Sequence, residues 1–147
     1  MKVKQRHWFW NVLLVLTVFV CAFALAMHYK NWLSEDSDHI KVRSGFYSVK
    51  VNFKELDSIV FVPRIPPMQR LNGFSGLEKE KGIFREFKDS LTDKKVYVFV
   101  DNISQQKIKL VSKDSATLYL NLKDSIKTLN LFNSIQRKSQ DGLPTPN

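Results

Sequence analysis

Histidines and carboxylates are the side chains of this chain whose types could support catalysis or hold a metal ion. The three histidines, His7, His28 and His39, show neither the i, i+4 spacing nor the pairing with carboxylates that is typical of a metal site. Glu78 and Glu80 could exchange protons with a substrate, but each alternates with a lysine, a pattern typical of a solvated loop. The sequence also lacks a Gly-x-x-x-x-Gly-Lys phosphate loop and a Gly-x-Ser-x-Gly nucleophile elbow. We therefore expect no catalytic residues, no cofactor and no metal.

Basic residues offer another kind of chemistry, the binding of an anionic partner. The chain carries 23 Lys and Arg against 14 Asp and Glu, a formal charge of +9. Such an excess is typical of a solvated surface, although it also attracts acidic partners and anionic lipid. Nucleic-acid binding would require exposed aromatic side chains between the bases, whereas Tyr97 and Phe99 are expected to be buried. We expect no nucleic-acid partner.

The segment from Pro63 to Lys81 is the candidate partner-binding loop. Its prolines cannot donate ladder hydrogen bonds, and Gly73 and Gly76 permit turns, so the segment is predicted to form no strand. Long loops on a rigid scaffold often carry function, although a simple connector fits the same pattern. The candidate partner-binding residues are Arg64, Arg70, Asn72, Phe74, Lys79 and Lys81.

An apolar segment near the N-terminus must position everything that follows it. No charged residue occurs from Trp8 to Met27, which matches the roughly 20 residues that cross a bilayer core. Because backbone polar groups in hydrocarbon must be bonded within the segment, a transmembrane helix is predicted over residues 8–29. A basic N-terminus over residues 1–7 precedes it, and a juxtamembrane linker over residues 30–39 follows. The candidate anchor residues are Trp8, Trp10, Leu13, Leu16, Phe19, Phe23 and Met27.

The charges on either side of the apolar segment indicate its orientation. Lys2, Lys4 and Arg6 precede it and acidic residues soon follow it, so the positive-inside bias predicts a cytoplasmic N-terminus and an extracytoplasmic domain at the cell (inner) membrane. A cleavable signal is the alternative, with a small-x-small site ending at Ala26, but the apolar stretch exceeds the roughly 7–15 residues of a signal core. The single cysteine, Cys21, allows no intramolecular disulfide.

Residues 40–138 have the pattern of one β-rich domain. Short apolar runs separated by turn residues predict antiparallel strands at 40–43, 46–51, 58–62, 82–87, 95–101, 107–111 and 117–121. The runs at 107–111 and 117–121 alternate apolar and polar residues, so one face of each is expected to be buried. In contrast, both faces of 95–101 are apolar, which predicts the central strand of the sheet.

The last predicted element is an amphipathic helix that begins at a capping Asp124. Its apolar residues recur every three positions, at Ile126, Leu129, Phe132 and Ile135. The helix is expected to end near Lys138, where basic side chains complement the helix dipole. Residues 139–147 are predicted to be a disordered tail.

Several motifs of the chain resemble those of bacterial membrane-associated pleckstrin-homology-like (PH-like) domains. They are Arg70–Phe74, Gly82–Phe84, Val96–Asn102, Tyr119–Asn121 and the helix that carries Thr128 and Leu129, and together they cover roughly residues 40–136. The resemblance implies a mainly β fold, a bent sheet or barrel of about seven antiparallel strands capped by a C-terminal α-helix. It also implies a membrane setting, with no assigned activity.

In eukaryotic relatives of this family, phosphoinositide headgroups occupy a basic pocket around the first hairpin loop. Here that loop is only Ser44 and Gly45, and alternation is expected to spread Lys41, Arg43 and Lys50 over different faces. No phosphoinositide pocket is therefore expected.

Two functions from different classes remain. The first is a non-enzymatic interaction module that holds a protein or peptide partner near the membrane, where tethering makes weak contacts sufficient. The second is an electrostatic reader of anionic lipid, in which basic residues of the domain face the headgroups. Cleavage near Ala26 would instead release the domain as a secreted protein. The sequence does not indicate an oligomeric state.

Overall fold

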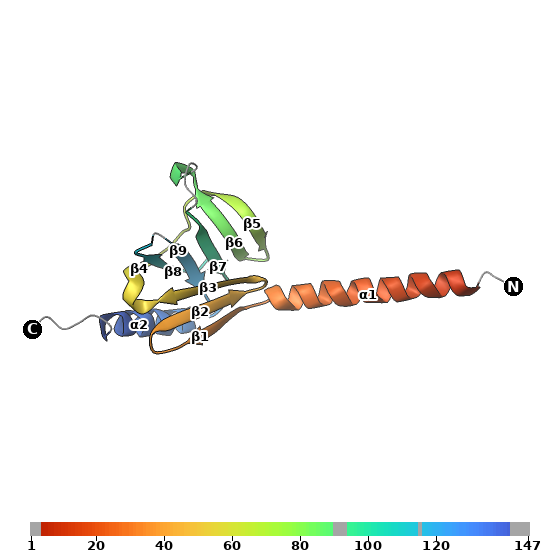
Figure 1. The fold of residues 1–147 in the computed structure, drawn as a ribbon, viewed down its shortest axis with the longest axis horizontal. Coiled ribbons are helices and arrows are strands. Elements are labelled where there is room, and N and C mark those ends of the chain that lie inside the picture. Colours follow the sequence, from red (N-terminus) through yellow and green to blue (C-terminus); the bar gives the residue numbers. More distant parts are fainter. Residues whose placement is uncertain (1–3, 90–93, 115, 142–147) are drawn as a thin grey trace, which may run out of the picture.

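The computed structural model describes residues 4–89, 94–114 and 116–141 of the 147-residue chain. Helix α1 (Lys4–His28) projects from the rest of the protein as a separate rod (Figure 1). The residues that follow form two β-sheets and a C-terminal helix, α2 (Ser125–Asp141). The expectation of a mainly β domain between an N-terminal apolar helix and a C-terminal helix is confirmed.

Helix α1 presents its apolar side chains to the surroundings. Residues His7–His28 are long and apolar enough to cross a membrane, and none of this span is buried within the protein. At 1.5 Å per residue the span measures about 33 Å, close to the roughly 30 Å of a bilayer core. An exposed apolar rod of this size calls for a lipid environment, a requirement that a membrane anchor and a signal sequence share.

A three-stranded antiparallel sheet follows α1 directly, in the order β1-β2-β3. Its strands are β1 (Asn31–Glu35), β2 (His39–Ser44) and β3 (Tyr47–Asn52). Strand β1 lies in the segment that was expected to be a linker, and that expectation is corrected here. Its sequence, NWLSE, has one apolar side chain on each face and too little alternation to be recognised, so pairing with β2 decides its structure.

The larger sheet has six strands in the order β4-β8-β9-β7-β6-β5. The strands are β4 (Leu56–Val62), β5 (Met68–Gly76), β6 (Lys79–Glu86), β7 (Val96–Val100), β8 (Lys107–Ser112) and β9 (Thr117–Asn121), with short 3-10 turns η1 (Phe53–Glu55) and η2 (Phe87–Asp89). The predicted central strand is confirmed, because β7 and β9 are the innermost pair. This pair is parallel, whereas the sequence predicted antiparallel pairing throughout.

Strand β5 lies inside the segment that was predicted to be a loop. Pro63, Pro66 and Pro67 all precede the strand, so they do not interrupt its hydrogen bonds. Gly73 lies within β5 and is paired with Gly82 of β6, instead of forming a turn. Both glycines have positive φ, of +155° and +151°. A methyl group on Gly82 would lie 2.2 Å from the carbonyl oxygen of Asn72, so these glycines allow the two strands to approach closely.

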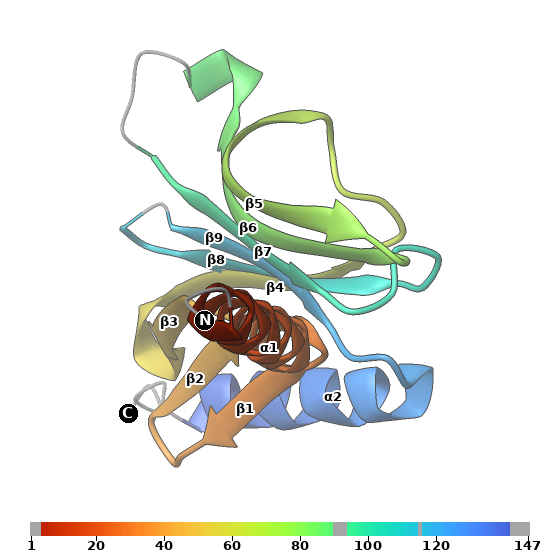
Figure 2. The ribbon, with the colours of Figure 1, turned by 90° about the vertical axis from the view of Figure 1, so that its right-hand side faces the viewer.

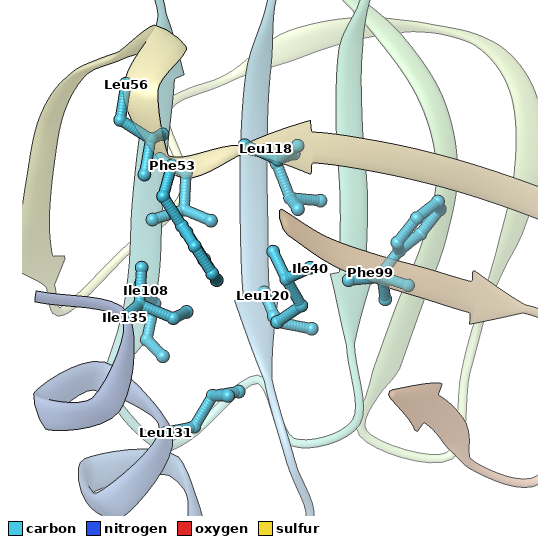
Figure 3. Packing of buried hydrophobic residues seen from close by; sticks show 12 residues of the cluster. Ile40, Phe53, Leu56, Phe99, Ile108, Leu118, Leu120, Leu131 and Ile135 are labelled. Atoms are coloured by element: carbon cyan, nitrogen blue, oxygen red, sulfur yellow. The ribbon is translucent and has the colours of Figure 1, made fainter. Parts of the chain in front are cut away.

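The main core lies between the six-stranded sheet and a second layer made of the three-stranded sheet and α2 (Figures 1 and 2). Figure 3 shows side chains from all these parts meeting in one cluster: Ile40, Phe53, Leu56, Phe99, Ile108, Leu118, Leu120, Leu131 and Ile135. A smaller cluster covers the opposite face of the sheet, with Phe84, Val96, Val98, Val100 and Tyr119. Strand β9 is thus buried on both faces, and the expectation of a single buried face is corrected.

Helix α2 begins as predicted, since the carboxylate of Asp124 accepts hydrogen bonds from the backbone N–H groups of Ile126 (2.8 Å) and Lys127 (3.3 Å). Its buried face differs from the predicted one. Thr128, Leu131 and Ile135 are buried, whereas Ile126 and Leu129 are 68% and 48% exposed. A strict three-residue repeat drifts around a helix of 3.6 residues per turn, so the two ends of the predicted stripe cannot both face the core. The helix continues to Asp141, and the rest of the predicted tail lies outside the described residues.

The close approach of β5 and β6 predicts that Gly82→Ala is destabilising. The alanine methyl group would collide with backbone and force a positive φ, which costs about 1–3 kcal/mol from backbone strain alone. The free energy of unfolding of the full chain in detergent, measured by urea titration, gives this cost. Gly76→Ala is the matched control, because its φ is not positive and its new methyl group meets only the far end of the Phe74 ring. Equal stability of the two variants would contradict the prediction.

Candidate functional site

The C-terminal end of α1 is joined to the domain by two lysines of β6. The ammonium group of Lys81 donates a hydrogen bond to the carbonyl of His28 (3.1 Å), and that of Lys79 donates to the carbonyl of Tyr29. The last carbonyls of a helix have no partner within the helix, and positive charge complements that end of its dipole. The two lysines therefore cap α1 from outside and set its position on the domain.

Aromatic contacts strengthen the same joint. The His28 ring packs edge-on against Phe46, in the turn between β2 and β3, with 5.3 Å between ring centroids. It also lies 6.3 Å from the ring of Phe74 in β5. The end of α1 thus contacts both sheets, because Phe46 lies in the hairpin turn of the smaller sheet and Phe74 in β5 of the larger one.

Lys81 also forms a buried ion pair with Asp101, which follows β7. The ammonium nitrogen lies 2.7 Å from Oδ1 of Asp101, and the two side chains are 0% and 3% exposed. Burial lowers the pKa of Lys81, while the hydrogen bond and the charge of Asp101 act in the opposite direction. Lys81 is one of the residues predicted to bind a partner, but its amine is enclosed and already bonded.

Asn31, the first residue of β1, connects this ion pair to the rest of the domain. Its backbone N–H donates to Oδ2 of Asp101 (3.1 Å), and its side-chain amide donates to the carbonyls of Phe99 (2.7 Å) and Asn121 (3.1 Å). Its Oδ1 accepts a hydrogen bond from the hydroxyl of Ser44 (2.6 Å). One buried asparagine therefore links both sheets at the point where the chain leaves α1.

Asn121, at the end of β9, completes the network on the other side of Asp101. Its Oδ1 accepts hydrogen bonds from the backbone N–H groups of Asp101 (2.8 Å) and Asn102 (3.1 Å). Its amide donates to the carbonyls of Asn102 (2.6 Å) and Gln106 (3.3 Å). The sequence predicted Asp101 and Asn121 as the last residues of two strands and, with Asn102, as parts of the motifs that resemble PH-like domains, but gave none of them a role in a site. Polar residues at the ends of two apolar strands were the signal available for this site.

Four of the remaining predicted partner-binding residues lie in the hairpin of β5 and β6. Asn72 accepts a hydrogen bond from the hydroxyl of Tyr47 (2.8 Å), and Phe74 and Lys79 lie beside the end of α1. Arg70 donates to the hydroxyl of Ser75 (2.8 Å), within the β5 strand itself. These four residues belong to one β5–β6 hairpin, so the structure does bring them together.

Arg64 lies apart from the hairpin, in a cavity of about 420 Å³ beside Glu80 and Lys107. Lys107 was expected to face solvent but is 2% exposed. Its amine donates to the carbonyl of Pro63 (3.0 Å) and to that of Ile103, and burial lowers its pKa. The bonded amine holds the segment before β5 against the loop after β7, and we assign it no chemical role.

His39 does pair with carboxylates, contrary to the expectation from its spacing. Its ring nitrogens lie 3.0 Å from Asp36 and 2.7 Å from Asp38, and the hydrogen bond from His39 lowers the pKa of Asp38. A turn between β1 and β2 brings the three together. Among the residues that the structure describes, no group of three or more His, Cys, Asp or Glu side chains is arranged to hold a metal ion.

Comparison of the chain with protein-family models, curated proteins and solved structures gave no match. What the protein does therefore has to be inferred from its own geometry. That geometry consists of an apolar helix, a buried polar joint that fixes the helix to the domain, and the exposed surfaces held around the joint.

The buried ion pair predicts a large effect of Lys81→Met on stability. The substitution leaves Asp101 buried without its cation, which costs about 3–5 kcal/mol. The double variant Lys81→Met/Asp101→Asn should recover much of this loss, because a neutral amide oxygen can still accept the hydrogen bond from Asn31. Urea unfolding of the full chain in detergent measures both variants. Lys54→Met, at an exposed lysine, is the control and should be nearly neutral.

Proposed function

We propose that this protein is a single-pass membrane-anchored, non-enzymatic interaction module that holds a protein or peptide partner beside the bilayer. The observation that carries the proposal is the position of β5. This strand forms an edge of the larger sheet and belongs to the hairpin that caps the end of α1. A partner bound to this edge would be held at a constant distance from the membrane.

Strand β5 has the properties of a docking edge. It is nine residues long and pairs with β6 on one side, while its other side faces no strand among the described residues. Such an edge offers unpaired N–H and C=O groups to an extended peptide. Two apolar side chains beside this edge are exposed to solvent. Leu71, in the strand itself, is 41% exposed, and Leu77, in the turn to β6, is 86% exposed. The side chains of an added strand would pack against these two leucines, and this contact would provide specificity.

A β-bulge limits where a partner strand can pair. The register shifts between Arg70 and Asn72, which leaves Leu71 as the additional residue. Bulges disrupt pairing and protect edges from unwanted association. The regular part of the edge is therefore residues 72–76, which is also the part closest to α1. Asn72 and Phe74 lie there, so two of the candidate partner-binding residues fall on the proposed edge.

An uncleaved anchor with an extracytoplasmic domain is part of this proposal. The last turn of α1 and Tyr29 take part in the packing of the domain, and cleavage after Ala26 would leave the capped residues His28 and Tyr29 without the helix that precedes them. Retention of α1 also maintains the high local concentration at the membrane that makes a weak edge contact sufficient.

A PH-like relationship remains a proposal. A β-rich domain with a C-terminal helix packed against its core supports it, as do the motifs that supply Asp101 and Asn121 to the buried joint. The parallel pairing of β7 with β9 departs from a meander, in which all neighbouring strands are antiparallel. The absence of catalysis is supported by Lys81 and Lys107, two buried lysines whose amines are bonded to groups of the chain itself.

The proposed edge predicts where a partner can be trapped. A photoreactive amino acid placed at position 71 of the full chain should form a crosslinked product of discrete mass in native membranes. The same probe at position 60 is the control, because Val60 is similarly exposed (43%) but belongs to β4, the opposite edge of the sheet. Substitution of Phe74 by lysine should reduce the product from position 71. Equal products from positions 71 and 60 would refute the β5 edge.

The anchor predicts the mass and the topology of the mature protein. Mass spectrometry of the membrane fraction should find the intact chain, which should resist extraction with carbonate. In a Cys21→Ala background, a cysteine at Lys127 should react with an impermeant maleimide in intact cells, whereas a cysteine at Lys4 should react only after lysis. A mature chain that starts after Ala26 would contradict anchoring, and the opposite labelling pattern would contradict the orientation.

A further inference from the structure

We propose that the junction of α1 with the three-stranded sheet binds one anionic phospholipid, with its phosphate on β2 and its acyl chains along α1. The site differs from the β5 edge and requires only that α1 is retained in the bilayer. The sequence also allowed a domain that reads anionic lipid, and this site gives that lipid a defined place on the protein.

A cavity of about 680 Å³ lies at this junction. Phe23, Ala26 and Met27, from the last two turns of α1, provide an apolar wall. Trp32 of β1 continues this apolar surface beyond the end of the helix, and Leu33, which packs against the main core, also borders the cavity. Acyl chains that run beside α1 in the bilayer would thus meet the apolar part of the cavity first.

The far end of the cavity is polar and basic. Ser34, Lys41 and Arg43 line it, and the antiparallel register places Ser34 opposite Lys41 and Trp32 opposite Arg43. Along the direction away from the membrane, the lining changes from apolar side chains to an indole and then to cations. A phospholipid presents the same order of groups, with acyl chains, a glycerol region and a phosphate.

The basic residues of this face carry like charges close together, and Lys50 also lies near the carboxylate of Asp38. Lys41 lies directly opposite Lys50 of β3, so Lys41, Arg43 and Lys50 share the exposed face of the sheet. This corrects the expectation that alternation would separate them, because two strands of a hairpin project paired residues to the same side. No ion pair within residues 4–89, 94–114 and 116–141 involves any of the three. Like charges placed opposite each other are unfavourable, and a bound phosphate would remove that cost.

The depth of the site agrees with the position of lipid headgroups. The span His7–His28 is about as long as a bilayer core is thick, so a helix that crosses it ends at the interface. Strand β1 begins three residues later, and the smaller sheet continues from the end of α1 (Figures 1 and 2). Trp32, with the ammonium of Lys30 4.1 Å from its ring centroid, is an aromatic residue of the type that lies among headgroups.

Fluorescence of Trp32 tests the site in the intact protein. The substitutions Trp8→Phe and Trp10→Phe leave Trp32 as the only tryptophan. The full chain is reconstituted in phosphatidylcholine vesicles that contain phosphatidylglycerol, with brominated acyl chains on either lipid at equal mole fraction. We expect brominated phosphatidylglycerol to quench Trp32 several-fold more strongly, because basic residues enrich anionic lipid beside them. In the variant Lys41→Gln/Arg43→Gln, the fluorescence of Trp32 should be quenched equally by both brominated lipids.

The matched control is Lys54→Gln/Lys113→Gln, which removes the same charge at the end of the domain far from α1 and should retain the preference. Thermal unfolding of each variant establishes that it is folded. Equal quenching by both lipids in the starting protein, or a preference that survives in Lys41→Gln/Arg43→Gln, overturns the proposal. An equal loss of the preference in the control also overturns the proposal, because it would indicate an effect of net charge. Abolition of the preference by soluble glycerol phosphate overturns it as well, because it would indicate a site for free phosphate.

Discussion

The ammonium group of Lys81 is fully buried between the carboxylate of Asp101 and the last carbonyl of α1. This arrangement offsets the desolvation cost of burying two charges, and it supplies a partner to a carbonyl that is unpaired at the helix end. Neither group could be satisfied by water there. The end of α1, the start of β1 and the ends of β7 and β9 all meet at this contact, because Asn31 donates to the carboxylate of Asp101 and Asn121 accepts from its backbone N–H.

This joint connects α1 closely to the domain. A flexible linker would let the domain rotate and sample many heights above the membrane. Here only Tyr29 and Lys30 separate α1 from β1, and the carbonyls of His28 and Tyr29 are both bonded to lysines of β6. Two exposed surfaces are consequently held in constant positions, the β5 edge on the larger sheet and the basic face of the smaller sheet. In the proposed function, membrane attachment and partner presentation therefore share one structural cause.

The two surfaces suit different partners because their chemistry differs. The β5 edge offers backbone hydrogen bonds beside exposed apolar side chains, which suits an extended peptide. The face with Lys41 and Arg43 offers uncompensated positive charge beside an apolar wall from α1, which suits a lipid. The distance between these surfaces is set by the joint, so a protein partner and a lipid could be bound at the same time.

The sequence by itself determined the elements whose signals are local. These are the apolar span of α1, the capping of α2 by Asp124, and the central strand Val96–Val100, which is apolar on both faces. Only the tertiary structure decided the rest, because those features depend on pairing between distant residues. Strands β1 and β5 have too little periodicity to be recognised alone, the shared face of Lys41 and Lys50 follows from hairpin register, and Lys81 is buried only because Asp101, 20 residues later, provides its counter-charge. A buried charge is stable only beside its partner, and a sequence does not state which residues become neighbours.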